Sequence, residues 1–168
     1  MAIRPIITYG SPVLREVAKP VESLTTEVKD LVADLKATLH QARGLGLAAP
    51  QMGELLRIFV VDLSAVDITA GTMVFINPEI IERLGIAEYE EGCLSFPGIY
   101  QNVTRPERIK VKALDENGRE FIMEAGGLAA RAIQHEYDHL EGVLFIDHFS
   151  AIGRALVDRK LKRLAKSA

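Results

Sequence analysis

One segment of the chain, His135-Glu136-Tyr137-Asp138-His139, has residue types and spacing that fit metal-assisted hydrolysis. It matches the pattern H-E-x-x-H, in which two histidines one helical turn apart project from the same face. Two imidazoles placed in this way can bind one metal ion, and the carboxylate of Glu136 beside them can carry protons. The segment therefore predicts a hydrolytic metal site.

The residues around this segment favour a helix from about Gly127 to Glu141. Apolar residues recur there at helical spacing, at Leu128, Ala132, Ile133 and Leu140. Gly142 is typical of the residue that follows the last turn of a helix. The motif thus has the local structure that its chemistry requires.

A third metal ligand must come from elsewhere, because a catalytic metal of this kind usually has three protein ligands and one open position. The longer metallopeptidase pattern places a histidine where this chain has Phe145. The remaining candidates are Cys93, His40 and His148. Cys93 is favoured because it follows Gly92 in a short polar turn and because a thiolate binds transition metals strongly.

Three segments resemble, in order and spacing, the signature motifs of the bacterial peptide deformylases. They are Gly44-Leu45-Gly46-Leu47-Ala48-Ala49-Pro50-Gln51, Glu91-Gly92-Cys93-Leu94-Ser95 and Gln134-His135-Glu136-Tyr137-Asp138-His139. The resemblance covers nearly the whole chain. It implies an enzyme that removes the formyl group from the N-terminal formylmethionine of newly synthesised polypeptides and releases formate.

Two other functions use the same residues. A zincin-type metallopeptidase needs a third ligand downstream, and Phe145 does not provide one. A non-enzymatic, metal-stabilised binding module needs four protein ligands, which would recruit His148 or His40.

The metal is not determined by the ligands alone. The set Cys93, His135 and His139 suits zinc and can also hold iron, cobalt or nickel. The resemblance implies Fe²⁺ as the working metal, with Zn²⁺ or Ni²⁺ able to replace it in purified protein.

Two further groups are assigned to catalysis by the resemblance, the side-chain amide of Gln51 and the backbone N–H of Leu94. Both can donate hydrogen bonds to the oxyanion that develops on the formyl group. Judged from its local sequence alone, Gln51 is more typical of an ordinary turn residue. Four polar residues are candidates for orienting the ligands: Glu91, Arg105, Gln134 and Asp138.

The substrate is expected to contact the motif helix on the face of His135. Three residues share that face and should line a cavity for the unbranched methionine side chain: Leu128, Arg131 and Ala132. The resemblance implies that Leu45 and Gly46 form the opposite wall, and it adds Gly92 beside the cysteine. For Leu128 and Leu45, ordinary core packing is an equally good interpretation.

The order of the elements predicts an α+β fold, with mainly antiparallel sheets packed around a central metal-binding helix and a further helix at the C-terminus. We expect helices from Ser11 to Ala18, from Thr25 or Thr26 to Arg43, and from about Ser150 onward. The expected strands are Ile58–Leu63, Met73–Asn77, Ile80–Leu84, Ile109–Leu114 and Arg119–Glu124, the last two joined by a hairpin at Asn117-Gly118.

The composition of the chain limits the number of domains and the cellular compartment. A chain of 168 residues with 48% hydrophobic content fits one domain, residues 1–168. One cysteine excludes an internal disulfide and fits a reducing compartment, and neither a membrane span nor a targeting segment is evident. We therefore expect a cytoplasmic protein without membrane contact, whose partners are nascent formylmethionyl peptides.

The predicted C-terminal helix is strongly basic in a chain with a net charge of −3. Its cations are Arg154, Arg159, Lys160, Lys162, Arg163 and Lys166. An apolar stripe should attach the helix to the body: Ile152, Leu156, Val157, Leu161 and Leu164. The basic face could contact ribosomal RNA, as the resemblance favours, or could simply be a solvated surface.

Overall fold

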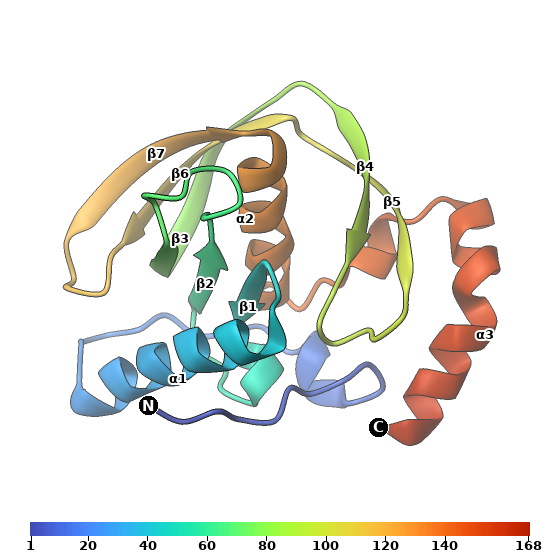
Figure 1. Cartoon of the computed structure of the whole chain (residues 1–168), viewed down its shortest axis with the longest axis horizontal. Helices are drawn as coiled ribbons and strands as arrows, with labels where there is room; N and C mark the ends of the chain where they lie inside the picture. Colours follow the sequence, from blue (N-terminus) through green and yellow to red (C-terminus); the bar gives the residue numbers. More distant parts are fainter.

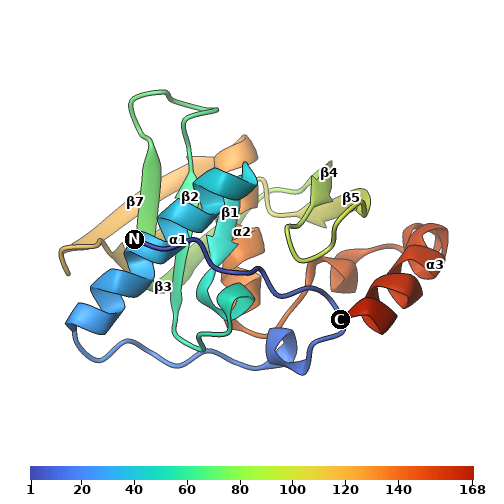
Figure 2. The same cartoon turned by 60° about the horizontal axis from the view of Figure 1, so that its bottom comes forward.

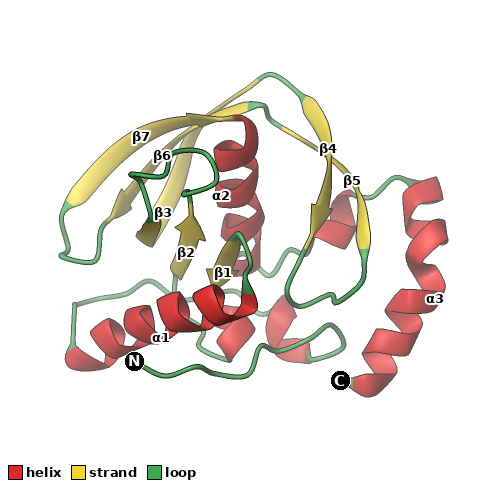
Figure 3. Ribbon diagram, viewed as in Figure 1, coloured by secondary structure: helices red, strands yellow, loops and turns green.

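The computed structural model describes residues 1–168, which form three α-helices, seven strands and three short 3-10 helices (Figures 1 and 3). In chain order the elements are η1 (Pro12–Arg15), α1 (Thr26–Ala42), β1 (Gly46–Ala48), η2 (Ala49–Met52), β2 (Ile58–Asp62), β3 (Thr72–Leu84), β4 (Ala87–Gly92), β5 (Tyr100–Arg105), β6 (Arg108–Leu114), β7 (Glu120–Gly126), α2 (Gly127–Leu140), η3 (Phe145–His148) and α3 (Ala151–Ser167).

The larger sheet has five antiparallel strands in the order β1-β2-β3-β6-β7. Along β2, side chains alternate between two buried layers. Ile58 and Val60 belong to the apolar cluster that contains α1, whereas Phe59 and Val61 belong to the cluster that contains α2. The strand is apolar from Ile58 to Val61 because helices cover both of its faces, as Figure 2 shows.

The smaller sheet is the antiparallel pair β4–β5, and in Figure 1 α2 stands between this pair and the five-stranded sheet. A third apolar cluster lies on the side of α3 and η3. Its buried members are Leu14, Phe96, Ile99, Val103, Leu144, Phe145, Ile146, Val157 and Leu161. The motif helix thus lies between the two sheets and packs against the larger one.

Most of the predicted elements are confirmed. The fold is α+β with antiparallel sheets around the motif helix, and this helix ends one residue before the expected Glu141. Thr25 caps α1 by accepting a hydrogen bond from the N–H of Val28. The hairpin β6–β7 turns at Asn117-Gly118, as its sequence indicates.

Two expectations about local structure were wrong, and three strands were missed. The predicted helix from Ser11 to Ala18 is only the four-residue η1, and the side chain of Ser11 makes no capping hydrogen bond. The predicted strands Met73–Asn77 and Ile80–Leu84 are one strand, β3, because irregular pairing with β6 accommodates Asn77 at φ 50° and the proline that follows it. Strands β1, β4 and β5 were not predicted, since they are short or largely polar.

The apolar stripe predicted for α3 is also partly wrong. Val157 and Leu161 are buried in the third cluster, but Ile152 and Leu156 are 76% and 73% exposed. The helix therefore contacts the body through a narrower face than its sequence indicates. No helix of the structure is both long enough and apolar enough to cross a bilayer.

Gly142 ends α2 in a left-handed conformation, with φ 71°, and packs against the chain near η1. A Cβ atom at this position would lie 2.5 Å from the backbone oxygen of Arg15. We expect Gly142→Ala to lower the free energy of unfolding by about 3 kcal/mol, from backbone strain and the clash together. Gly71→Ala is the control: its φ is 60° with no atom nearby, so strain alone should cost about 1 kcal/mol. Equal losses in urea denaturation of the two variants would contradict the packing argument.

Candidate active site

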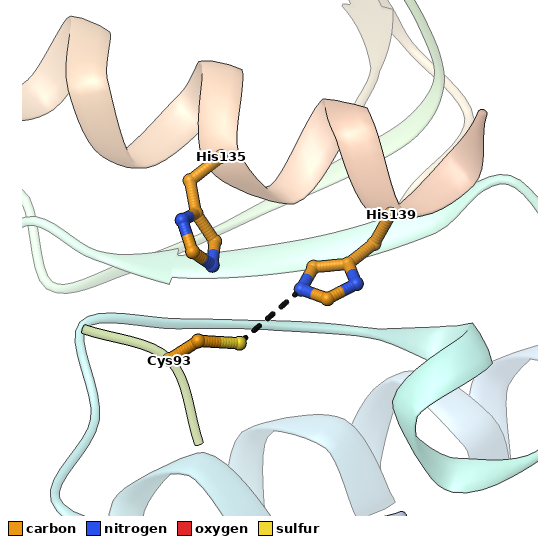
Figure 4. Close-up of side chains that lie close together, drawn as sticks. All are labelled: Cys93, His135 and His139. Atoms are coloured by element: carbon orange, nitrogen blue, oxygen red, sulfur yellow. Dashed lines mark hydrogen bonds between the residues drawn. The ribbon is translucent and has the colours of Figure 1, made fainter. Parts of the chain in front are cut away.

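The three predicted ligands lie together between α2 and the turn that follows β4 (Figure 4). The donor atoms of Cys93, His135 and His139 are all within 4.8 Å of one another, and the Cys93 sulfur is 3.5 Å from Nε2 of His139. The other candidates lie elsewhere: His40 is outside this group, and His148 is hydrogen-bonded to Asp138. The structure thus brings together one thiol and two imidazoles.

Glu136 lies beside these residues with its side chain against β1. A Cβ atom on Gly46 would be only 2.6 Å from Oε2 of Glu136, so glycine is needed for the strand to run this close to the carboxylate. Burial raises the pKa of Glu136 to about 7, and its Oε1 has no hydrogen-bond partner. A carboxyl group with such a pKa can both accept and release a proton near neutrality.

A second buried carboxylate, Glu91, orients the site from β4. Its Oε1 accepts from Nδ1 of His135 at 3.0 Å, and its two oxygens accept from Nε of Arg105 at 2.6 Å and from NH2 of Arg105 at 3.0 Å. Oε2 also accepts from NH1 of Arg131 at 2.5 Å. Burial alone would raise the pKa of Glu91, but the hydrogen bonds from His135 and Arg105 outweigh burial and hold the pKa well below its usual range. Glu91 is therefore ionised and fixes Nε2 of His135 toward the thiol.

The electrostatics of the two imidazoles fit a cation site. Burial and the nearby His135 lower the pKa of His139 well below its usual value, which leaves the neutral form that binds metal. Burial also opposes protonation of His135, yet Cys93 and Glu91 outweigh it and raise the pKa of that imidazole. The ionised Glu91 therefore places negative charge behind His135, next to the point where the three donors meet. A Cys-His-His set with a free carboxylate oxygen beside it fits a catalytic transition metal.

A pocket of about 300 Å³ opens beside this group. All six residues predicted to contact substrate line it: Leu45, Gly46, Gly92, Leu128, Arg131 and Ala132. Leu128 is 47% exposed, so core packing does not explain it. Arg131 has a mainly bracing role, because its guanidinium donates to Glu91 and to the backbone oxygens of Val103 and Ala87.

Five further residues that line the pocket could not be identified from the sequence: Arg43, Gly44, Glu90, Leu94 as a side chain, and Tyr100. No periodicity marks them, because they come from loop positions and strand ends that only the tertiary fold brings together.

The two predicted oxyanion donors lie near Cys93. Nε2 of Gln51 is 3.0 Å from the hydroxyl of Ser95 and 3.7 Å from the Cys93 sulfur, and its Oε1 accepts from the N–H of Ala48. Gln51 is therefore no ordinary turn residue, although nothing in its local sequence indicates this. The N–H of Leu94 donates to no protein acceptor, which leaves it free for a ligand.

Comparison with known proteins identifies similar sequences and folds. A family model described as Polypeptide deformylase matches residues 3–155. A peptide deformylase from Mesorhizobium japonicum is 50% identical over 167 residues, covering 99% of this chain and 95% of the relative. Peptide deformylase 1 from Clostridium perfringens is 54% identical over 148 residues, covering 88% and 99%. The crystal structure of the peptide deformylase from Thermus thermophilus matches with a TM-score of 0.91 and 41% identity, over 99% of this chain and 100% of that one.

The ligand set predicts the effect of removing the thiol. We expect Cys93→Ser to lose Zn²⁺ or Co²⁺ to a chelator roughly 10-fold faster than the parent, because a neutral hydroxyl is a much poorer ligand than a thiolate. His40→Gln, at an exposed histidine outside the group, should retain metal like the parent. Metal-to-protein ratios measured after gel filtration check both variants. Full occupancy in Cys93→Ser would show that the third ligand is another residue.

Proposed function

The chain belongs to the polypeptide deformylase family, and we propose that Cys93, His135, His139, Glu136, Gln51 and Leu94 carry out the reaction of that family. The chain is thus an enzyme that removes the N-formyl group from nascent peptides, and a zincin-type peptidase is not favoured. The observation that supports the residue assignment is the convergence of three ligand donors within 4.8 Å of one another beside a buried carboxylate.

We propose that Cys93, His135 and His139 hold Fe²⁺, with Zn²⁺ or Ni²⁺ as replacements in purified protein. A divalent cation held by these three residues would supply Lewis-acid chemistry: it would lower the pKa of a water molecule and polarise the formyl carbonyl. The protein residues keep the ligands in their binding forms: Glu91 orients His135, and burial keeps His139 neutral.

Glu136 performs the proton transfers in this mechanism. Its free Oε1 accepts a proton from the attacking water and then delivers it to the nitrogen of the departing amine. The N–H of Leu94 and the amide of Gln51 donate to the carbonyl oxygen as negative charge develops there. Because Glu136 and Gln51 are buried, water does not screen these interactions.

The pocket beside the ligands is proposed to hold the methionine side chain. Leu128 and Ala132 offer apolar contacts on the α2 side, and Leu45 offers them on the opposite side. Gly46 and Gly92 carry no side chain, so the substrate backbone can approach β1 and the end of β4 closely.

We also propose that residues 1–168 act as one domain in the cytoplasm. Helix α2 packs against strands of the five-stranded sheet, and its side chains bond to Glu91 and Arg105 of the smaller sheet, so the two sheets share one site. The nascent formylated chains that form the substrate emerge in this compartment, and its reducing conditions preserve the Cys93 thiol.

Replacing Glu136 tests the mechanism. We expect Glu136→Gln to reduce formate release from a short formyl-methionyl peptide by roughly 100-fold or more, because the amide cannot accept the proton of the attacking water. Metal content should stay at the parent value, since Glu136 is not a ligand. Loss of the metal together with activity would instead make Glu136 a structural residue. Cleavage of internal peptide bonds by the parent would revive the zincin-type alternative.

Helix α3 is proposed to contact the ribosome through its basic face. Its exposed cations are Arg159, Lys160, Lys162, Arg163 and Lys166, of which Lys162 pairs with Asp158 at 2.9 Å. Lys160 also donates to the backbone oxygen of Gly98 at 3.4 Å. Because α3 is attached through the buried Val157 and Leu161, its exposed cations remain accessible to ribosomal RNA.

Charge reversal tests this contact better than truncation, because truncation would remove buried Val157 and Leu161 from the third cluster. We expect the triple variant Arg159→Glu, Lys162→Glu, Arg163→Glu to bind ribosomes roughly 10-fold more weakly at low salt and to hydrolyse small formyl peptides like the parent. The matched control reverses three exposed cations elsewhere: Lys29, Arg83 and Arg119. Equal binding by both variants across a salt titration would leave α3 a solvated surface.

A further inference from the structure

A line of hydrogen-bonded charges leads from the ligand His135 to the protein surface and ends at His148. We propose that His148 is a positioning residue for His135, acting through Asp138, Arg105 and Glu91. The proposal rests on the assignment of His135 as a metal ligand, and it gives a role to a histidine that lies outside the ligand group.

The geometry of this line is continuous. Nε2 of His148 lies 2.8 Å from Oδ2 of Asp138, and NH1 of Arg105 lies 2.9 Å from the same oxygen. The other two donor nitrogens of Arg105 hold both oxygens of Glu91, and Oε1 of Glu91 accepts from Nδ1 of His135. The Asp138 carboxylate therefore accepts from the same guanidinium that, together with Arg131, holds Glu91 against His135.

The Asp138 carboxylate needs hydrogen-bond donors from outside α2 to hold it in place. It lies in the last turn of α2, where the partial negative charge of the helix terminus disfavours a carboxylate. Its side chain is 20% exposed, so without a second donor the carboxylate can rotate toward water. Arg105 approaches it from the buried side and His148 from the solvent side. A carboxylate only accepts hydrogen bonds, so Nε2 of His148 carries a hydrogen and donates whether the ring is neutral or charged.

The backbone of His148 is fixed relative to His135. His148 ends η3, whose Phe145 and Ile146 are buried, and the ring centroid of Phe145 lies 5.5 Å from that of His135. Asp147 of the same 3-10 helix pairs with Arg15 at 2.6 Å. The imidazole of His148 is itself 35% exposed, so a substitution there changes the donor without opening the core.

Two variants separate donation from packing. His148→Leu fills similar space and removes the donor, whereas His148→Gln can place an amide Nε2 close to the position of the imidazole Nε2. A third variant, Arg15→Leu, removes the ion pair of the same 3-10 helix and leaves the line of charges intact. The test uses the Zn²⁺-loaded protein, kinetics with a formyl-methionyl peptide, and ¹H–¹⁵N spectra of the histidine rings.

In His148→Leu we expect the Nδ1–H resonance of His135 to exchange with water at least about 10-fold faster, and kcat to fall roughly 10-fold with KM unchanged. Loss of Zn²⁺ to a chelator should accelerate by a similar factor. His148→Gln should restore all three properties to near the parent values, and Arg15→Leu should keep them.

Parent-like exchange of the His135 proton in His148→Leu would overturn the proposal. So would equal defects in His148→Leu and His148→Gln, or a defect of the same size in Arg15→Leu, because each would mean that disturbance of η3 rather than donation is responsible. The double variant Asp138→Asn, His148→Leu should be no worse than Asp138→Asn alone, since both act on one line; additive losses would also overturn it. Failure of Glu136→Gln to lose activity would challenge the proposed function but would leave these ring spectra interpretable.

Discussion

The buried carboxylate of Glu91 is the group on which the site depends. A charge that has lost its water must be paired, and Glu91 is paired by residues from two elements: Arg105 from β5, and Arg131 and His135 from α2. These bonds join the small sheet to the motif helix. Because β4 ends one residue before Cys93, the pairing of Glu91 also determines where the thiol lies relative to the imidazoles. The ligand geometry is thus a consequence of charge pairing as much as of helix spacing.

The two sides of the pocket depend on different features of the chain, oriented side chains on α2 and a missing side chain on β1. On α2, helical spacing fixes the polar groups that we propose to act on the substrate, and buried partners hold their orientation. On β1, what matters is the lack of a side chain at Gly46, which brings backbone close to Glu136. A larger residue at Gly46 would displace the Glu136 carboxylate from the position in which we propose that it accepts a proton. The oriented polar groups of α2 and the closely approaching backbone of β1 together suit a small formamide.

Local patterns in the sequence predicted much of this structure. Helical periodicity and a glycine stop were enough for α2, and the Asn117-Gly118 turn was enough for its hairpin, because both depend on residues close together in the chain. The signature motifs contain all three residues of the Cys93, His135 and His139 group. What could not be predicted depends on pairing across the fold: β4 is polar and exposed along most of its length, so its strand character comes only from β5. Gln51 approaches Cys93 across 42 residues, and Ile152 and Leu156 follow helical spacing without meeting a partner.

The three proposed metal ligands come from distant parts of the chain. Metal binding is therefore coupled to folding. Cys93 precedes the histidine pair by more than forty residues, so the unfolded polypeptide has no preformed site for a cation. A cation that binds only the native state shifts the folding equilibrium toward that state by mass action. We therefore expect chains without metal to unfold more often than loaded chains and to be more exposed to proteases.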